Sequence, residues 1–401
     1  MSNQTNTMNI KNYVFINQLV LKFLGFYPIN IIRYLICISC IMFIVIPQII
    51  MIYINWNDLN IVMETGSTLL TILLAALKSI VWIFNRKNLE FFIKFMLTDY
   101  WKIIETNVFE YLQEYAIYAK NITKGYFISM CNALLFFFSL PIIEILTKNE
   151  NLNNFTIKNF PFAASYPITF YKFPFYEIAY ISQILATSIC CLMMLAIDSL
   201  IATALLHTCG HFTVLKENLK NLDTYIYDLT NLKTNSKHIN KNLYEIKNQI
   251  TYIIKHHQLV LWFCDNMEKN FHLMLFLQAI TSSLIICFVG FQISIALTER
   301  SKFLESFSHL IVSLFQLLLF CFPGDILMRQ SFSVSIAAYS IQWYQLPVFI
   351  KDEICMIILR SQRPSYITAG KLYIMHLENF TAILSTAFSY FMILQSFNIE
   401  A

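Results

Sequence analysis

Glycine, proline and charge are all scarce in this chain of 401 residues. It has 7 glycines and 9 prolines, and 13% of its residues are charged, against about a quarter in a typical soluble domain. No glycine-rich phosphate-binding loop, GxSxG or HExxH occurs. The net charge of +4 contains no basic block. These absences argue against nucleotide-binding or hydrolytic enzymes and against nucleic-acid binding, and we expect no enzyme activity and no cofactor.

The cysteines and histidines do not indicate a metal site or a disulfide framework. Cys37 and Cys40 form a CxxC pair, but it lies in an apolar stretch without a second ligand pair. We expect four further candidate ligands to be ordinary packed histidines, not metal ligands: His207, His211, His256 and His257. The chain also opens without the basic segment and cleavage site of a secretory signal, so we expect no cleavable signal peptide.

What the chain has in abundance is apolar sequence. Hydrophobic residues make up 57% of it, with 36 Phe and 22 Tyr. A helix of about 20 apolar residues crosses a hydrocarbon core of about 30 Å. The sequence therefore predicts an all-α membrane protein with seven transmembrane helices. The seven stretches are 34–54, 65–84, 126–146, 180–207, 271–297, 303–323 and 374–397.

The charged residues inside these stretches raise one open question. Lys78 lies about six residues from an end of the second stretch, and we expect it to extend its ammonium group to the membrane surface. The alternative is a buried ion pair with an acid such as Asp198 in the fourth stretch.

Seven spans place the two termini on opposite sides of the membrane. Segments 85–125, 208–270 and 324–373 are charged and helix-patterned, whereas 147–177 is rich in Asn, Pro and aromatics and carries a glycosylation sequon at Asn154. We therefore expect an inverted topology, with a cytosolic N-terminus and an external C-terminus. The distribution of Lys and Arg favours it only weakly, because the inner segments are also longer.

The predicted organisation has four parts. These are a cytosolic N-terminal segment 1–33, spans one to six with cytosolic helical loops 34–323, a cytosolic anchor segment 324–373, and a seventh span with a short external tail 374–401. Apolar faces on helical extensions outside the membrane need protein partners. We therefore expect this chain to assemble with other subunits.

The last span carries a stripe of polar residues. Ser385, Ser389 and Ser396, together with Ile393, share one helix face because they are spaced by four, four and three residues. The serines either bond to their own helix and pack against a neighbour, or line a water-filled path. The sequence leaves both interpretations open.

Two C-terminal stretches carry ordered motifs. The first holds Phe322-Pro323-Gly324, Ala337-Ala338-Tyr339 and Gln342-Trp343-Tyr344, and the second holds Arg360-Ser361-Gln362-Arg363-Pro364, Thr368-Ala369-Gly370-Lys371, Leu377-Glu378-Asn379-Phe380 and Ser389-Tyr390-Phe391. Their order and spacing resemble the C-terminal signature of insect odorant receptors, most like those of ants, bees and wasps. The N-terminal stretch Leu21-Lys22-Phe23-Leu24-Gly25-Phe26-Tyr27-Pro28 is also similar to that family.

This resemblance implies an odorant-gated, non-selective cation channel. Such receptors form a heterotetramer with a shared odorant co-receptor in the plasma membrane of sensory-neuron dendrites. The seventh span lines the pore, cytosolic helices anchor the subunits, and a small volatile ligand binds in the outer half of each bundle. The chain is similar to a tuning subunit and not to the co-receptor, because it is shorter and its second long inner loop lacks the co-receptor's insertion.

Three alternatives are weighed against this resemblance. A gustatory receptor would carry Gln where Ser396 stands in the last span. A G-protein-coupled receptor would carry an Asp/Glu-Arg-Tyr and an NPxxY motif, neither of which is present. A membrane enzyme or transporter would need an ionisable cluster, which the sequence does not show.

The resemblance and the helix faces together give candidate site residues. The predicted pocket residues are Ser67, Leu70, Leu74, Phe137, Phe138, Pro141, Tyr180, Gln183, Thr187, Phe288, Phe291 and Phe307. The predicted pore residues are Ser385, Ser389, Ile393 and Ser396, with Ile393 as an apolar gate. The predicted subunit-anchor residues are Trp343, Tyr344, Pro364 and Phe380.

Overall fold

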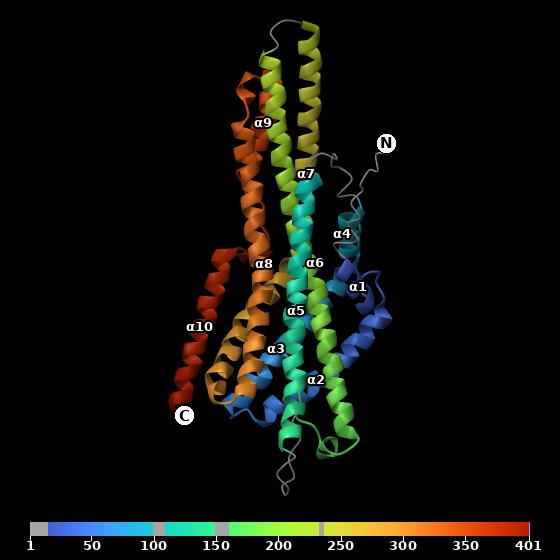
Figure 1. Cartoon of the computed structure of the whole chain (residues 1–401), viewed down its shortest axis with the longest axis vertical. Coiled ribbons are helices and arrows are strands. Elements are labelled where there is room, and N and C mark those ends of the chain that lie inside the picture. Colours follow the sequence, from blue (N-terminus) through green and yellow to red (C-terminus); the bar gives the residue numbers. More distant parts are fainter. Residues whose placement is uncertain (1–14, 99–108, 149–159, 232–235, 401) are drawn as a thin grey trace.

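The computed structural model describes residues 15–98, 109–148, 160–231 and 236–400. The elements in this part of the chain are almost all helical (Figure 1). They are α1 Phe15–Leu24, α2 Ile31–Ile54, α3 Leu59–Phe84, α4 Arg86–Thr98, α5 Phe109–Lys148, η3 Ile168–Tyr171, α6 Phe175–Asn231, α7 Ser236–Ile295, η4 Ala296–Thr298, α8 Arg300–Ser340, η5 Trp343–Gln345, α9 Val348–Ser361, β1 Thr368–Ala369, β2 Tyr373–Ile374 and α10 Leu377–Glu400.

Seven of these helices, α2, α3, α5, α6, α7, α8 and α10, are long and apolar enough to cross a membrane. Each coincides with one of the stretches expected from the sequence to within three residues at either end of that stretch or extends beyond it, so the prediction of seven spanning helices is confirmed. Local side chains fix some of their starts. Asp58 Oδ1 accepts from the backbone N–H of Asn60 and Ile61 at 3.0 and 3.4 Å and so caps α3.

The central helix of the bundle is α6. It packs against α1, α2, α3, α5, α7 and α8, and 83% of its most apolar window is buried within the chain. Near its middle, small and branched side chains alternate with no exposure at all, as at Ala196, Ile197, Ile201 and Ala204. A helix that is apolar on every face is stable only when neighbours surround it. This composition places α6 in the core.

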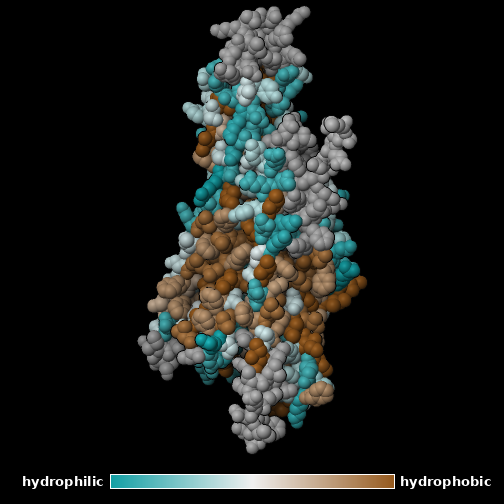
Figure 2. Space-filling view, in the orientation of Figure 1, coloured by the Kyte–Doolittle hydropathy of each residue, from teal (hydrophilic) through white to brown (hydrophobic). Residues whose placement is uncertain are grey.

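Helices α5, α6, α7 and α8 continue well past their membrane stretches. Figure 1 shows the far ends of α6 and α7 and the helix α9 gathered at the upper end of the molecule, while α10 stays in the lower half. Figure 2 shows apolar side chains concentrated over the lower half and hydrophilic ones over much of the upper half. The upper half is therefore an extension beyond the apolar belt, as the charged helical segments predicted.

The seventh spanning helix begins later than expected. The sequence placed its start at residue 374, but Ile374 belongs to β2, which pairs with β1 through Thr368 and Ile374. The hairpin turns at Gly370 and Lys371, both with φ of 62°, a region that glycine adopts without strain. Residues in a strand cannot continue a helix, and α10 therefore starts only at Leu377.

This hairpin is held against the bundle by close backbone contacts. The Gly370 N–H donates to the carbonyl of His272 in α7 at 2.8 Å, and Glu268 accepts from the backbone N–H of Thr368 at 2.7 Å. A Cβ at Gly324 of α8 would overlap the carbonyl oxygen of Met375. The glycine of the Phe-Pro-Gly motif therefore lets the chain pass directly over α8 before α10 begins.

Candidate functional site

Two neighbouring cavities lie at the lower end of the bundle. The mouth, of about 190 Å³, is bordered by the start of α3, the end of α7 and the start of α8. The chamber, of about 90 Å³, lies among α3, α5, α6, α7 and α8. Thr68, Phe137 and Phe162 border both. The two cavities are therefore adjacent, with these three residues between them.

The wall of the chamber is mostly apolar. Met130, Phe137, Phe162, Met194 and Ile285 all contribute to it. The rings of Phe137 and Phe162 stack with centroids 4.9 Å apart. Such a wall favours a small, mainly apolar ligand, with a few polar groups setting its orientation.

The polar side chains of the chamber come from several helices. Thr71 of α3 and His309 of α8 meet with Oγ1 and Nε2 3.1 Å apart. Gln316, two turns further along α8, directs its amide nitrogen at Asp198 Oδ2 at 2.6 Å. These groups give an otherwise apolar cavity a defined hydrogen-bonding pattern.

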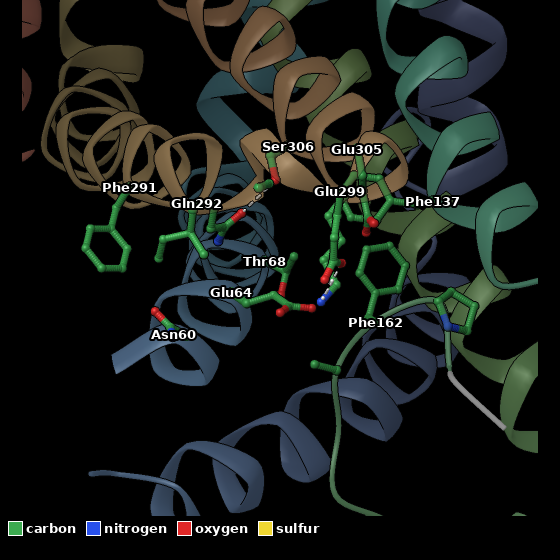
Figure 3. A pocket seen from close by; sticks show the side chains of 15 residues that line it. Asn60, Glu64, Thr68, Phe137, Phe162, Phe291, Gln292, Glu299, Glu305 and Ser306 are labelled. Carbon is green, nitrogen blue, oxygen red and sulfur yellow. Dashed lines mark hydrogen bonds and ion pairs between the residues drawn. The ribbon is translucent and has the colours of Figure 1, made fainter. Parts of the chain in front are cut away.

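The mouth is charged where the chamber is not. Figure 3 shows Glu64, Glu299 and Glu305 beside the cavity, with Phe137 and Phe162 along one wall. Lys302 forms an ion pair with Glu299 at 3.1 Å, and both side chains are more than half exposed. An exposed pair of this kind contributes little to stability. The mouth is therefore a polar entrance to an apolar interior.

The structure resolves the open question about Lys78. Its Nζ lies 2.6 Å from Asp198 Oδ1, and the two side chains are 1% and 0% exposed. The expectation that Lys78 reaches the membrane surface is therefore wrong, and the alternative of a buried pair with Asp198 is confirmed. The physical reason is that α6 occupies the bundle centre, where Asp198 faces α3 and neutralises a charge that would be costly if buried alone.

Three further side chains complete a network around this ion pair. Lys78 Nζ donates to Gln278 Oε1 at 2.5 Å, while Gln316 Nε2 and the Tyr126 hydroxyl donate to Asp198 Oδ2 at 2.6 and 3.2 Å. The network joins α3, α5, α6, α7 and α8. Because Gln316 also lines the chamber, the buried ion pair sets the orientation of one of its polar groups.

Three of the predicted pocket residues border the two cavities. Phe137 borders both, Thr187 borders the chamber and Phe291 borders the mouth. Gln183 lies behind the wall, where its Oε1 accepts from the backbone N–H of Phe162 at 3.1 Å. Tyr180 donates its hydroxyl proton to the backbone carbonyl of Phe138 in α5 at 2.8 Å. Gln183 therefore positions Phe162, which the sequence did not single out.

The remaining predicted residues lie outside the lining of these two cavities. Ser67 accepts from Gln292 Nε2 at 2.8 Å, and the Phe288 ring packs against Gly66. Phe307 is 44% exposed. Leu70 and Leu74 of α3 and Phe138 and Pro141 of α5 complete this set, and among them Leu74 is fully buried. As odorant contacts, these residues stay predictions.

Sequence reasoning missed several lining residues because it selected a neighbouring face of the helix. On α3 it selected the face with Ser67, Leu70 and Leu74, whereas Thr68 and Thr71 line the chamber. One residue along an α-helix turns the face by about 100°. Other residues missed on α5, α6 and α8 lie nearer the membrane centre: Met130, Cys190, Met194, His309 and Gln316. The polar pair of His309 and Gln316, spaced by seven residues in an apolar span, was the signal available.

The predicted pore residues lie on a surface that the single chain leaves uncovered. Ser385, Ser389 and Ser396 are exposed, and Ile393 is 53% exposed. Ser389 Oγ donates to the Ser385 carbonyl at 2.9 Å and Ser396 Oγ to the Ile393 carbonyl at 2.8 Å. Two of the serines therefore bond to their own helix, but none of the three is packed away from the surface by this chain.

Of the predicted anchor residues, two lie together at the upper end. The Trp343 and Tyr344 rings contact edge to face with centroids 6.5 Å apart, and Tyr344 is 60% exposed. Pro364, beyond the end of α9, is half-buried. Phe380 is in the first turn of α10 and packs against the core. Pro364 and Phe380 thus lie apart from the Trp343 and Tyr344 pair.

The four histidines form no metal cluster among the described residues. His211 and His256, above the membrane stretches of α6 and α7, are joined by Nδ1 and Nε2 at 3.0 Å. Burial lowers the pKa of His256 to about 4. Burial, with a smaller contribution from His256, also lowers the pKa of His211. Both rings are therefore neutral at pH 7. The glycosylation sequon at Asn154 lies outside the described residues.

Comparison with known proteins decides the family. The family described as 7tm Odorant receptor matches residues 58–388. The chain belongs to the insect odorant receptor family. It is 23% identical over 350 residues to odorant receptor 10 of Aedes albopictus, covering 85% of this chain and 86% of that protein. It is also 23% identical over 357 residues to odorant receptor Or2 of Anopheles gambiae, covering 87% and 88%.

Solved structures show that the fold of this receptor is shared. The olfactory receptor OR5 of Machilis hrabei superimposes with a TM-score of 0.80 at 14% identity, covering 96% of this chain and 98% of that one. The same receptor in complex with eugenol gives a TM-score of 0.79. The family excludes the gustatory, G-protein-coupled and enzyme alternatives, and the receptor is a multi-pass membrane protein. That this receptor is most similar to the odorant receptors of ants, bees and wasps stays a prediction.

Proposed function

We propose that this receptor is a tuning subunit of an odorant-gated cation channel, assembled with odorant co-receptor subunits as a heterotetramer. In this proposal the N-terminus is cytosolic and the C-terminus is external. A small volatile ligand binds in the chamber, and α10 lines a pore shared with the neighbouring subunits. The channel lies in the plasma membrane of olfactory sensory dendrites.

The exposure of α10 supports this proposal most strongly. Only 6% of its most apolar window is buried in the chain, against 83% for α6. Lipid suits the apolar part of that surface, but a row of serine hydroxyls is better satisfied by water or protein. A pore-lining helix at a subunit interface suits both parts of this surface, since its apolar face contacts a neighbouring subunit or lipid and its serine face contacts water.

The upper end of the molecule gives the proposed assembly its contact surface. Tyr339, Tyr344, Val348 and Met356 are 69%, 60%, 71% and 73% exposed, in the part of the chain that extends beyond the apolar belt. Large apolar side chains exposed to water in one region are typical of protein–protein interfaces. Aromatic residues at such a surface often supply much of the binding energy.

The ligand need only bind the open state more tightly to open the channel. The chamber touches α3, α5, α6, α7 and α8, so a ligand in it contacts most of the bundle at once. A change in the packing of α8 reaches α10 directly, because the two helices are in contact. The ligand shifts the equilibrium by its differential affinity for the two states.

Expression of the receptor with and without the co-receptor tests the proposal. With the co-receptor we expect odour-evoked cation current, and without it little or none at equal surface labelling. Tags at each terminus should be accessible from the cytosol at the N-terminus and from outside at the C-terminus. Robust current from the chain alone, or reversed tag accessibility, would contradict the tuning-subunit proposal.

A further inference from the structure

The hydroxyl groups of the chamber have no free protons to offer a ligand. Thr68 and Thr71 donate to the carbonyls of Thr65 and Ser67, each at 2.9 Å. Thr187 donates to Gln183 at 2.8 Å and Ser313 to His309 at 2.9 Å, again at backbone carbonyls. A hydroxyl has one proton. The four hydroxyls that line the chamber are therefore all committed to their own helices.

The hydrogen bond from Thr71 to the Ser67 carbonyl also fixes the tautomer of His309. Because the single proton of Thr71 Oγ1 goes to Ser67, the contact of 3.1 Å between Thr71 Oγ1 and His309 Nε2 requires the proton to be on Nε2. His309 is 8% exposed and lies in an apolar wall, where a neutral ring is favoured over a charged one. A neutral imidazole carries one proton, so its Nδ1 holds a lone pair. Among the described residues nothing donates to this Nδ1.

Gln316 is fixed by the buried ion pair in a similar way. Both carboxyl oxygens of Asp198 act as acceptors, Oδ1 from Lys78 Nζ at 2.6 Å and Oδ2 from the Tyr126 hydroxyl at 3.2 Å. The side of Gln316 that faces it at 2.6 Å must be the NH₂ group. A second contact, to the sulfur of Met194 at 3.9 Å, uses the same nitrogen. The carbonyl oxygen Oε1 is left without a donor in the described part of the chain.

We propose that the chamber selects ligands with a hydrogen-bond donor, small alcohols and phenols above all, over ethers, esters and hydrocarbons of the same size. His309 Nδ1 and Gln316 Oε1 accept the ligand's hydroxyl proton, and the apolar wall holds its carbon skeleton. An ether brings another acceptor to a cavity whose strong donors are already used. This inference rests on the proposed function, since it assigns the ligand class of the same chamber.

Isomeric pairs of volatile compounds test the inference. The receptor is expressed with the co-receptor, and the concentration for half-maximal current is measured for hexanol and methyl pentyl ether, and for benzyl alcohol and anisole. Each pair has one formula and differs in whether the oxygen carries a proton. One hydrogen bond between neutral groups corresponds to about a three- to tenfold lower half-maximal concentration for the alcohol.

Variants at the Thr71–His309 pair identify the group that recognises the hydroxyl. Thr71→Val removes the acceptor that holds the proton on Nε2, so His309 can present an N–H and the alcohol preference should fall. Thr71→Ser keeps that acceptor and should keep the preference. His309→Phe keeps a ring but removes its lone pair, and should bring the ratio of the two concentrations closer to one. The ratio is read within each variant, so reduced surface expression does not imitate the result.

The outcomes separate this inference from the proposed function. Currents evoked equally by alcohols and ethers, or more strongly by ethers, overturn the donor preference and leave the odorant-gated channel standing. An alcohol preference that is unchanged in both Thr71→Val and His309→Phe also overturns it. Absence of current from every compound, with both subunits labelled at the cell surface, contradicts the proposed function itself.

Discussion

Helices α6 and α10 are both apolar enough to span a membrane, yet their surroundings are opposite. The most apolar window of α6 is 83% buried and that of α10 is 6% buried. The difference lies in which surfaces meet neighbours within this chain, since α6 packs on six other helices whereas α10 contacts mainly α7 and α8. Hydropathy identifies both as spans, but it does not tell whether a span faces protein or lipid.

This contrast predicts where substitutions should be costly. A buried polar group in α6 needs a hydrogen-bond partner within the same chain, because neighbouring helices of this chain enclose it. The exposed stripe of α10 has no such requirement in the isolated chain. We therefore expect changes around α6 to reduce folding and surface expression, and changes on the exposed face of α10 to alter current with little effect on folding.

The largest effect is expected for Lys78→Met. It leaves Asp198 of α6 as a buried charge without its cation, which costs about 3–5 kcal/mol of folding free energy. Surface labelling and the melting temperature in detergent should both fall sharply. The matched control is Lys87→Met at an exposed position on α4, which should change neither. The double variant Lys78→Met/Asp198→Asn, which removes both charges, should recover part of the loss, and no recovery would contradict the pairing.

The pair of histidines between α6 and α7 predicts a pH dependence. In the folded receptor the pKa of His256 is about 4, below its ordinary value of 6.5, so on acidification the unfolded chain takes up the proton first. The contribution of neutral His256 to the folding free energy is fully present above about pH 6.5. It is lost as the pH falls towards 4, where the loss for this residue reaches about 3 kcal/mol.

Melting temperatures of the wild type and of His256→Gln, measured between pH 7.5 and 5, test this expectation. The wild type should lose stability across the range, and the variant should lose less. Equal slopes for the two proteins would show that His256 is not responsible. The comparison is made within detergent-solubilised receptor, so that the pH sensitivity of channel current does not enter it.

Gly324→Ala should have an intermediate effect at the junction of the two regions. The added methyl group overlaps the Met375 carbonyl, and overpacking of this kind costs about 1–3 kcal/mol. We expect reduced surface expression and a displaced start of α10. Gly290→Ala is the control, because its methyl group would lie 3.7 Å from Phe391 in ordinary contact. Similar losses in the two variants would argue against a specific contact at Gly324.

The smallest effect on folding is expected at Ile393, on the exposed stripe of α10. Substitutions at exposed positions usually change stability by less than about 0.5 kcal/mol. If this residue forms an apolar gate, Ile393→Ser should raise basal leak, and Ile393→Trp should reduce maximal current with little change in half-maximal concentration. Ala387→Trp, at a position 1% exposed on the packed face of the helix, should instead lower surface labelling.

Current per labelled receptor decides between a gate and a packing role for Ile393. Normal leak and normal maximal current in both Ile393 variants would remove the residue from the pore. Lower surface labelling with unchanged current per receptor would mean that Ile393 is buried by a partner and only packs there. Either result would mean that the exposed face of α10 at Ile393 does not line a pore, and the contrast with the buried α6 would then concern packing alone.

The sequence was sufficient for the seven spans because each contains an apolar run of about the length that a membrane requires. It was insufficient for their ends. The helical pattern of segment 208–270 indicated helix beyond residue 207, but not that α6 continues without a break from its span to Asn231, because a helix continues as long as packing outside the membrane supports it. The start of α10 was misplaced because the Gly370 turn depends on contacts with α7, which local sequence does not contain.

The candidate site was harder to predict than the fold. Phe137 was found because aromatic residues in the outer part of a span favour a pocket wall, but Thr71 and His309 were missed. Their role depends on the rotation of α3 and α8 about their own axes, and an error of one residue turns a helix by about 100°. Lys78 and Asp198 were recognised as a possible pair, and only the three-dimensional position of α6 shows that they meet.

Helix α8 links the chamber to the base of α10. This helix carries Gln316 in the chamber wall and Gly324 beneath Met375, eight residues apart, which is about 12 Å along one continuous helix that includes Pro323. The segment that precedes α10 passes over Gly324, and the Gly370 N–H ties the same segment to α7 through the His272 carbonyl. We therefore expect a tilt or rotation of α8 at the chamber to reach the base of α10 along one helix, without a long relay of side chains.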